Sequence, residues 1–166
     1  MTRFRLVAVL VLGALASAVL ADQTAVNPAW EKMKTLVGDW EGTAEGHPAK
    51  VSYRLVSSGT ALQENLSTAD GGEMVSMYHP DGARLVMTHY CSENNQPRMR
   101  AAGLSADGKR VEFQFVDATN LASPDAPHMV GLMLVFQDAD HLTQRWTHQL
   151  APGNAQTGDF QFTRKK

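Results

Sequence analysis

The chain has little cysteine, and it lacks the short motifs that mark common reactions. Its 166 residues include a single cysteine, Cys91, so an internal disulfide is excluded and core burial must supply the stability. The sequence contains no Gly-x-Ser-x-Gly elbow, no His-Glu-x-x-His zinc motif and no glycine-rich phosphate loop. Standard hydrolase, zinc-peptidase and nucleotide chemistry is therefore unsupported. We assign no catalytic residue, and the sequence favours a protein that is not an enzyme.

The chain also lacks an excess of basic residues. It carries 15 lysines and arginines against 17 aspartates and glutamates, a formal net charge of −2. Proteins that lie along a phosphate backbone need a positively charged stripe or patch. The sequence offers none, so we do not expect nucleic acid as a partner.

Only one long hydrophobic run is present, and it lies at the N-terminus. Two arginines precede an apolar segment from Leu6 to Leu20, and small residues lead up to Ala21. This order is typical of a secretory signal peptide, predicted here over 1–21 with cleavage after Ala21 or Ala18. The run is about fifteen residues, shorter than the roughly twenty of a spanning helix. We expect a periplasmic or secreted protein with no membrane span after cleavage; a retained anchor is the alternative.

The mature chain begins with a short helix and continues as strands. Asn27 is a capping residue before Pro28, and apolar residues at spacings of three and four predict a helix of two to three turns that stops at Gly38. From Trp40 onward, alternating segments are separated by turns rich in Gly, Asp, Asn and Pro. The segments predict strands at 39–44, 50–56, 61–67, 73–79, 84–91, 99–104, 110–116, 128–137, 141–149 and 157–164.

This pattern predicts the fold class. About ten short strands cannot lie in one open twisted sheet without curling, and closure removes the exposed edges that invite aggregation. We therefore predict an all-β protein, an antiparallel up-and-down barrel of about ten strands with a short N-terminal helix, forming one domain over 22–166. The longest irregular stretch, 117–127, is expected to be a loop at the rim.

A short motif at the start of the strands resembles a known superfamily. The run from Leu36 to Gly42, which contains Gly38 and Trp40, is similar to the Gly-x-Trp opening of the calycin barrels, which include lipocalins and fatty-acid-binding proteins. Ten strands without a helical insertion resemble the nitrobindin-like branch, and the segment 77–99 resembles uncharacterised exported bacterial lipocalin-like proteins. The resemblance implies that Trp40 packs across the barrel base under a late arginine, Arg164 first and Arg145 second.

Two strands place polar and soft side chains on one face. Side chains alternate between the faces of a strand, so Met87, His89 and Cys91 share one face of the strand predicted at 84–91. In the strand predicted at 141–149, Trp146 shares a face with Gln144 and His148. A large aromatic side chain with polar groups on one face is typical of a ligand cavity. We expect an apolar or amphipathic small molecule bound in the lumen. The candidate ligand-binding residues are Gln63, Tyr78, Met87, His89, Gln144, Trp146 and His148.

A soft metal is an alternative ligand at the first of these strands. His89 and Cys91 lie about 6 to 7 Å apart along a strand, and together with Met99 they would suit an ion such as copper. The competing interpretation is ordinary packing, in which Met87 and Cys91 are core hydrophobes and His89 is a hydrogen-bonded lumen group. The residues favour packing, and we predict no cofactor.

Two further alternatives concern haem and the outside of the barrel. The nitrobindin-like branch includes haem binders whose axial histidine lies near the C-terminus, whereas 157–164 contains no histidine. Haem would require a substitute such as His148 or His128. The remaining alternative is a structural or partner-binding barrel with a filled lumen.

Overall fold

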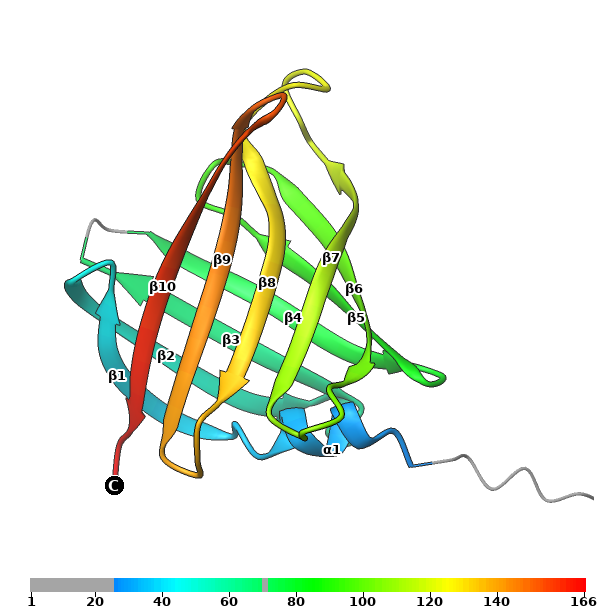
Figure 1. Cartoon of the computed structure of the whole chain (residues 1–166), viewed down its shortest axis with the longest axis vertical. Helices are drawn as coiled ribbons and strands as arrows, with labels where there is room; N and C mark the ends of the chain where they lie inside the picture. The colour runs from blue at the N-terminus through cyan, green and yellow to red at the C-terminus, as the bar shows by residue number, and fades with distance from the viewer. Residues whose placement is uncertain (1–25, 70–71) are drawn as a thin grey trace, which may run out of the picture.

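The computed structural model describes residues 26–69 and 72–166, so the predicted signal peptide lies outside the described residues. These residues form a closed barrel of ten antiparallel strands with one short helix (Figure 1). Among them, no helix combines the length and apolar character needed to cross a membrane. The elements are α1 (Pro28–Lys34), β1 (Gly38–Ala44), β2 (His47–Val56), the 3-10 turn η1 (Ser57–Gly59), β3 (Ala61–Thr68), β4 (Glu73–Asp81), β5 (Arg84–Tyr90), β6 (Gln96–Leu104), β7 (Arg110–Thr119), β8 (His128–Phe136), β9 (His141–Ala151) and β10 (Asn154–Arg164).

The predicted fold class is confirmed. Each strand pairs with its neighbours in sequence, and β1 pairs with β10 to close the barrel. The elements differ from the predicted ones at their ends, and α1 ends at Lys34, before the predicted stop at Gly38. Strand β6 begins at Gln96 because Gln96 pairs with Thr119, and β10 begins at Asn154 because Asn154 pairs with Ala151. Since β7 continues to Thr119, the rim loop between β7 and β8 is shorter than predicted.

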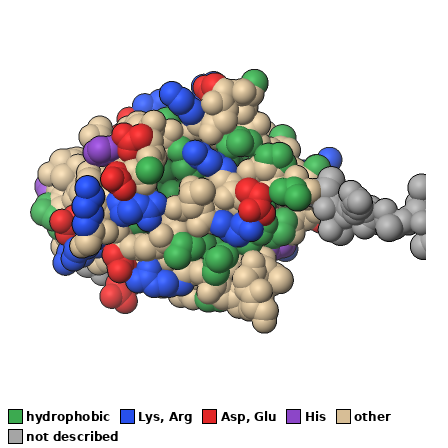
Figure 2. Space-filling view, turned by 90° about the horizontal axis from the view of Figure 1, so that it is seen from below, with side chains coloured by type: hydrophobic (Ala, Val, Ile, Leu, Met, Phe, Trp, Pro, Cys, Tyr) green, Lys and Arg blue, Asp and Glu red, His purple; other side chains and the backbone are tan. Residues whose placement is uncertain are grey.

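The two ends of the barrel differ. Helix α1 lies across one end, which we call the helix end (Figure 1). Asn27 fixes it there: its Oδ1 accepts from the Trp30 amide at 3.1 Å, and its Nδ2 donates to the carbonyls of Gly82 and Arg84, each at 3.0 Å. The opposite end, the mouth, is formed by the β1–β2, β5–β6 and β9–β10 turns and the β7–β8 loop (Figure 1). Figure 2 shows charges of both signs mixed with hydrophobic side chains on the face seen from below.

The helix end is closed by Trp40 and Arg164. Trp40 is buried, and its Nε1 donates to the Leu36 carbonyl at 2.8 Å. The Arg164 guanidinium lies 4.1 Å from the centre of the Trp40 ring and donates to the carbonyls of Thr35 and Val37 at 2.7 and 2.8 Å. Arg164 therefore covers the tryptophan and also satisfies carbonyls that follow α1. Arg145, the second candidate for this position, pairs with Asp159 instead.

Gly38 is required where α1 leads into β1. Its φ of +136° is a conformation that residues with a side chain rarely adopt, and a Cβ there would lie 2.9 Å from Nη1 of Arg164. We expect Gly38→Ala to lower the free energy of unfolding by about 2–3 kcal/mol, from backbone strain and displacement of Arg164. Urea unfolding followed by tryptophan fluorescence measures this change.

Gly46, in the turn between β1 and β2, provides the matched control. It also has a positive φ, +87°, but nothing lies within 4 Å of the position its Cβ would take. Gly46→Ala should therefore cost only the backbone strain, about 1 kcal/mol. Equal losses in the two variants would show that contact with Arg164 contributes nothing at Gly38.

Candidate functional site

A hydrogen-bonded polar cluster occupies the middle of the lumen, centred on Glu64 of β3. Glu64 is fully buried, and its Oε2 accepts from the Tyr78 hydroxyl at 2.8 Å and from Nε2 of Gln144 at 3.2 Å. The same Gln144 nitrogen donates to the Tyr53 hydroxyl at 2.6 Å, while its Oε1 accepts from Nε1 of Trp146 at 2.9 Å. Side chains from β2, β3, β4 and β9 therefore orient one another inside the barrel.

Ser76 of β4 and His89 of β5 lie beside this cluster, each directly across from the preceding residue on the neighbouring strand. Glu64 lies opposite Ser76 in the register of β3 and β4, and Ser76 lies opposite His89 in the register of β4 and β5. The Ser76 Oγ is 3.0 Å from Nδ1 of His89, a hydrogen bond that can run in either direction. The His89 ring also packs against Trp146, with 4.6 Å between the ring centres. Polar groups therefore form a row from Glu64 to His89.

A small cavity adjoins this row on its mouth side. Its volume is about 10 Å³, room for about one water molecule. The lining is apolar except for one imidazole, and three of its members, Met74, Met129 and Phe160, are only half-buried. Methionine side chains adapt readily to a guest because they have several rotatable bonds. The cavity is lined by Leu66, Met74, His89, Met129, Trp146 and Phe160.

His89 presents an unsatisfied nitrogen in this environment. Among the described residues, the buried side-chain atoms without a hydrogen-bond partner are Oε1 of Glu64, Nε2 of His89 and Oδ1 of Asn95. Leaving a buried polar group unpaired costs about 1–3 kcal/mol, so such atoms mark places where a further partner would be stabilising. His89 is one of these residues and also lines the cavity, which makes its Nε2 the natural contact for a bound molecule.

Burial controls the charges of this cluster. It raises the pKa of Glu64 to about 7, although the hydrogen bonds from Tyr78 and Gln144 act in the opposite direction. Burial also lowers the pKa of His89 to about 4, so its imidazole is neutral at ordinary pH. The pKa values of Tyr53 and Tyr78 are raised well above 10, by burial and by the nearby Glu64 carboxylate. Near neutral pH, Glu64 is therefore the member of the cluster that changes charge.

Six of the seven predicted ligand residues fall into three groups. Tyr78, His89, Gln144 and Trp146 meet in the polar cluster or at the cavity. Met87 is buried opposite Met99, in the core rather than at the cavity. His148 lies nearer the mouth, where its Nε2 is 3.1 Å from a Glu93 carboxylate oxygen.

Gln63 requires a correction. It lies on the outer face of β3, where its amide nitrogen donates to Oδ1 of the exposed Asn65 at 2.9 Å. The polar lumen residue of this strand is Glu64, because Leu62 and Leu66 share its face. A signal was present in the sequence, since Glu64 stands between two leucines at a spacing of two. A charged residue on an apolar strand face indicates a buried polar group with partners.

The metal and haem alternatives gain little from this geometry. Cys91 follows the end of β5 and is half-buried, and neither it nor Met99 lines the cavity beside His89. In the described part of the chain, no group of three His, Cys, Asp or Glu side chains is arranged to hold a metal. The cavity has room for about one water, so a haem, like any larger guest, would have to displace side chains there.

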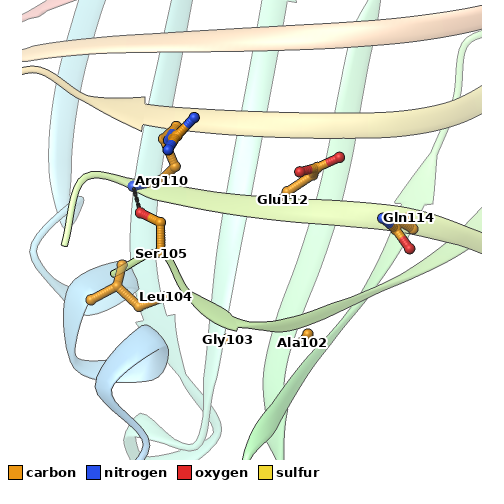
Figure 3. Close-up of a pocket in the computed structure, with 7 residues that line it drawn as sticks. All are labelled: Ala102, Gly103, Leu104, Ser105, Arg110, Glu112 and Gln114. Carbon is orange, nitrogen blue, oxygen red and sulfur yellow. Dashed lines mark hydrogen bonds between the residues drawn. The ribbon is translucent and has the colours of Figure 1, made fainter. Parts of the chain in front are cut away.

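A larger hollow lies outside the barrel, between β6 and β7. The register of these strands shifts between Ala101 and Leu104, and the resulting groove has a volume of about 430 Å³ (Figure 3). The Ser105 hydroxyl accepts from the Arg110 amide at 2.8 Å at one end of it (Figure 3). The side chains of Arg110, Glu112 and Gln114 are exposed to water. The groove therefore presents polar side chains that are exposed to water, whereas the cavity lined by His89 presents a buried one.

Comparisons with known proteins support the architecture. No protein-family profile and no curated protein matches the chain. The crystal structure of Rv2717c from M. tuberculosis is similar, with a TM-score of 0.61, 16% sequence identity, and coverage of 84% of this chain and 98% of that one. At this identity the likeness shows the fold alone. The chain is a closed ten-stranded antiparallel β-barrel that shares its fold with Rv2717c.

The raised pKa of Glu64 predicts a pH-dependent stability. The folded protein holds this proton more tightly than the unfolded chain, since the pKa rises from 4.5 to about 7 on folding. The contribution of Glu64 to the free energy of unfolding therefore falls as pH increases from 4.5 to 7. We expect Glu64→Gln to match wild type at pH 4 and to exceed it by about 3 kcal/mol at pH 8.

Urea unfolding of both proteins across this pH range measures the difference. Glu112→Gln is the control, because Glu112 is exposed on the outer face of β7 and its substitution should leave the profile of wild type unchanged. A constant difference between Glu64→Gln and wild type from pH 4 to pH 8 would contradict the prediction.

Proposed function

We propose that the protein is an exported, calycin-like carrier that binds a neutral amphipathic small molecule at the mouth of its barrel. In this proposal the polar group of the ligand contacts Nε2 of His89, and its apolar part lies between Met74, Met129 and Phe160. The observation that carries the proposal is the buried, unpartnered His89 nitrogen in a residue that lines an otherwise apolar cavity. Binding sites of small molecules typically combine apolar walls with a few placed polar groups.

The charges around the cavity support a neutral ligand. None of the six lining residues carries a charge, because five are apolar and burial keeps the sixth, His89, neutral. A carboxylate or ammonium group buried there would have no counter-charge, which is strongly unfavourable. Alcohols, ketones, amides and neutral lipids meet the requirement, whereas fatty-acid anions do not.

The walls of the cavity support a ligand with an apolar body. Met74, Met129 and Phe160 are half-buried on the mouth side, and the two methionine side chains have several rotatable bonds with which to adapt to a guest. Trp146, packed against His89, supplies a fixed aromatic wall. A guest larger than one water therefore enters by displacing side chains at the mouth.

The apolar N-terminal segment and its small-residue end support export to the periplasm or the cell exterior.

The experiment is native mass spectrometry of protein purified gently from its own compartment, followed by solvent extraction and titration with neutral lipids and alcohols. Wild type should retain or take up a neutral molecule. His89→Phe keeps a ring beside Trp146 but removes the nitrogen, and should weaken binding by about 2- to 10-fold, the contribution of one hydrogen bond. His141→Ala is the matched control, since His141 is exposed at the helix end.

Three outcomes would overturn the proposal. Equal binding by wild type and His89→Phe would remove His89 from the site. Absence of any bound molecule across the library would favour a structural or partner-binding barrel with a filled lumen. Stoichiometric copper, or a haem absorption band, that is lost in His89→Phe would favour the metal or haem alternative; elemental analysis and an absorption spectrum of the same sample provide this check.

A further inference from the structure

We propose that a second hollow, at the rim of the mouth, is a binding site for a small organic ammonium ion, a primary amine with a short apolar chain. This rim hollow lies between the β5–β6 turn and the β7–β8 loop. It shares no lining residue with the cavity beside His89. Binding at the rim is therefore independent of the proposed function.

The rim hollow is large enough for such a guest. Its volume is about 530 Å³, within the range of about 300–1,000 Å³ that is common for small-molecule sites. One wall is the turn at 93–95, and the other is formed by residues 120–122 and 126–127 of the loop. An amine with several carbon atoms therefore fits between the turn and the loop.

Hydrogen bonds hold the two walls of the rim hollow together. Nδ2 of Asn95 in the turn donates to the Pro127 carbonyl in the loop at 2.9 Å. In the opposite direction, Nδ2 of Asn120 donates to the Asn94 carbonyl. Within the turn, the Cys91 amide donates to the Asn95 carbonyl at 3.1 Å. A site with walls that are already ordered loses less conformational entropy when a ligand binds.

Asn95 contributes a buried acceptor that lacks a donor. The residue lines the rim hollow and is only 3% exposed. The Pro127 carbonyl can only accept, so the amide nitrogen of Asn95 must face it, and the orientation of the amide is settled. The amide oxygen, Oδ1, has no hydrogen-bond partner among the described residues. Since buried polar atoms are normally paired, the rim hollow favours a ligand that donates a hydrogen bond.

The charge of the rim hollow selects the kind of donor. Of the described residues that line it, Glu93 alone is charged, and its side chain is 36% exposed. One of its oxygens, Oε2, lies 3.1 Å from Nε2 of His148. A carboxylate can accept about four hydrogen bonds, so this contact leaves most of its capacity free. An ammonium group brings a positive charge and three donors, which match a site that offers a carboxylate and an amide oxygen.

The rest of the lining favours an organic cation over a metal ion. Leu121, Ala126 and Pro127 contribute apolar surface that an alkyl chain can cover. Calcium takes about six to eight oxygen ligands, commonly from several carboxylates, whereas Glu93 is the one carboxylate of the described lining. The rim hollow therefore suits a cation that has an apolar body.

Titration of the purified protein with n-butylamine at pH 7, where the amine is an ammonium ion, followed by ¹H–¹⁵N NMR, tests the proposal. The backbone amide signals of 93–95 and 120–126 should shift. The side-chain amide signal of Asn95 should shift with them, because its oxygen gains a donor. The side-chain amide of Asn65, which is exposed on the outer face of β3, should not move.

Two comparisons isolate the charge. n-Butanol has the same chain but no charge, and should bind about 2- to 5-fold more weakly than the amine, the contribution of a partly exposed ion pair. Glu93→Gln keeps the shape of the side chain, and should weaken binding of the amine by the same factor while leaving that of the alcohol unchanged. Glu112→Gln, which removes an exposed carboxylate from the outer face of β7, is the matched control and should bind both as wild type does.

Four results would overturn the proposal. The first is the absence of shifts at 93–95 and 120–126 on addition of the amine. The second is equal binding of amine and alcohol, and the third is equal binding of the amine by Glu93→Gln and wild type. The fourth is a saturable shift of the same signals with calcium chloride but not with the amine, which would assign the rim hollow to a metal ion.

Discussion

The lumen of this barrel must hold a carboxyl group to which no lysine or arginine of residues 26–69 and 72–166 is paired. Glu64 lies in the apolar interior, and the partners that it has are hydroxyl and amide donors. Burying such a group is costly unless it is hydrogen-bonded or protonated, and both solutions are present. Its partner Gln144 is itself a buried polar group and accepts in turn from Trp146. On the two neighbouring strands, Ser76 is hydrogen-bonded to His89, whose other ring nitrogen has no partner among the described residues.

The fold could be predicted from the sequence because its signals are local. Turn residues separate segments that alternate with a period of two, and closing so many short strands leaves few architectures. The cover over Trp40 came from the resemblance instead, since Arg164 lies more than a hundred residues away in sequence. Strand ends were less predictable, because residues such as Gln96 and Asn154 look like turn residues until their partners are known.

The site was only partly predictable, because its members are defined by which face of each strand is inside. His89, Gln144 and Trp146 could be found, since each shares a face with hydrophobic neighbours. Gln63 was assigned to the lumen, whereas the inward residue is the neighbouring Glu64, whose charge ordinarily belongs on the surface. Only the position of Tyr78, Tyr53 and Gln144 around Glu64 explains how that carboxyl is tolerated. Such long-range hydrogen bonds leave no trace in local sequence pattern.

The pairing of β1 with β10 has a consequence for the order in which the molecule assembles. The first strand is without its outer neighbour until the last strand is in place, and Arg164, near the end of that strand, is also the residue that covers Trp40. A chain that emerges N-terminus first therefore exposes an unpaired strand edge and an open core for almost the whole of its synthesis. The barrel can close only in a single late step, after β10 has been synthesised. Until then, the unpaired edge of β1 and the open core are both accessible to a chaperone that binds unfolded chains.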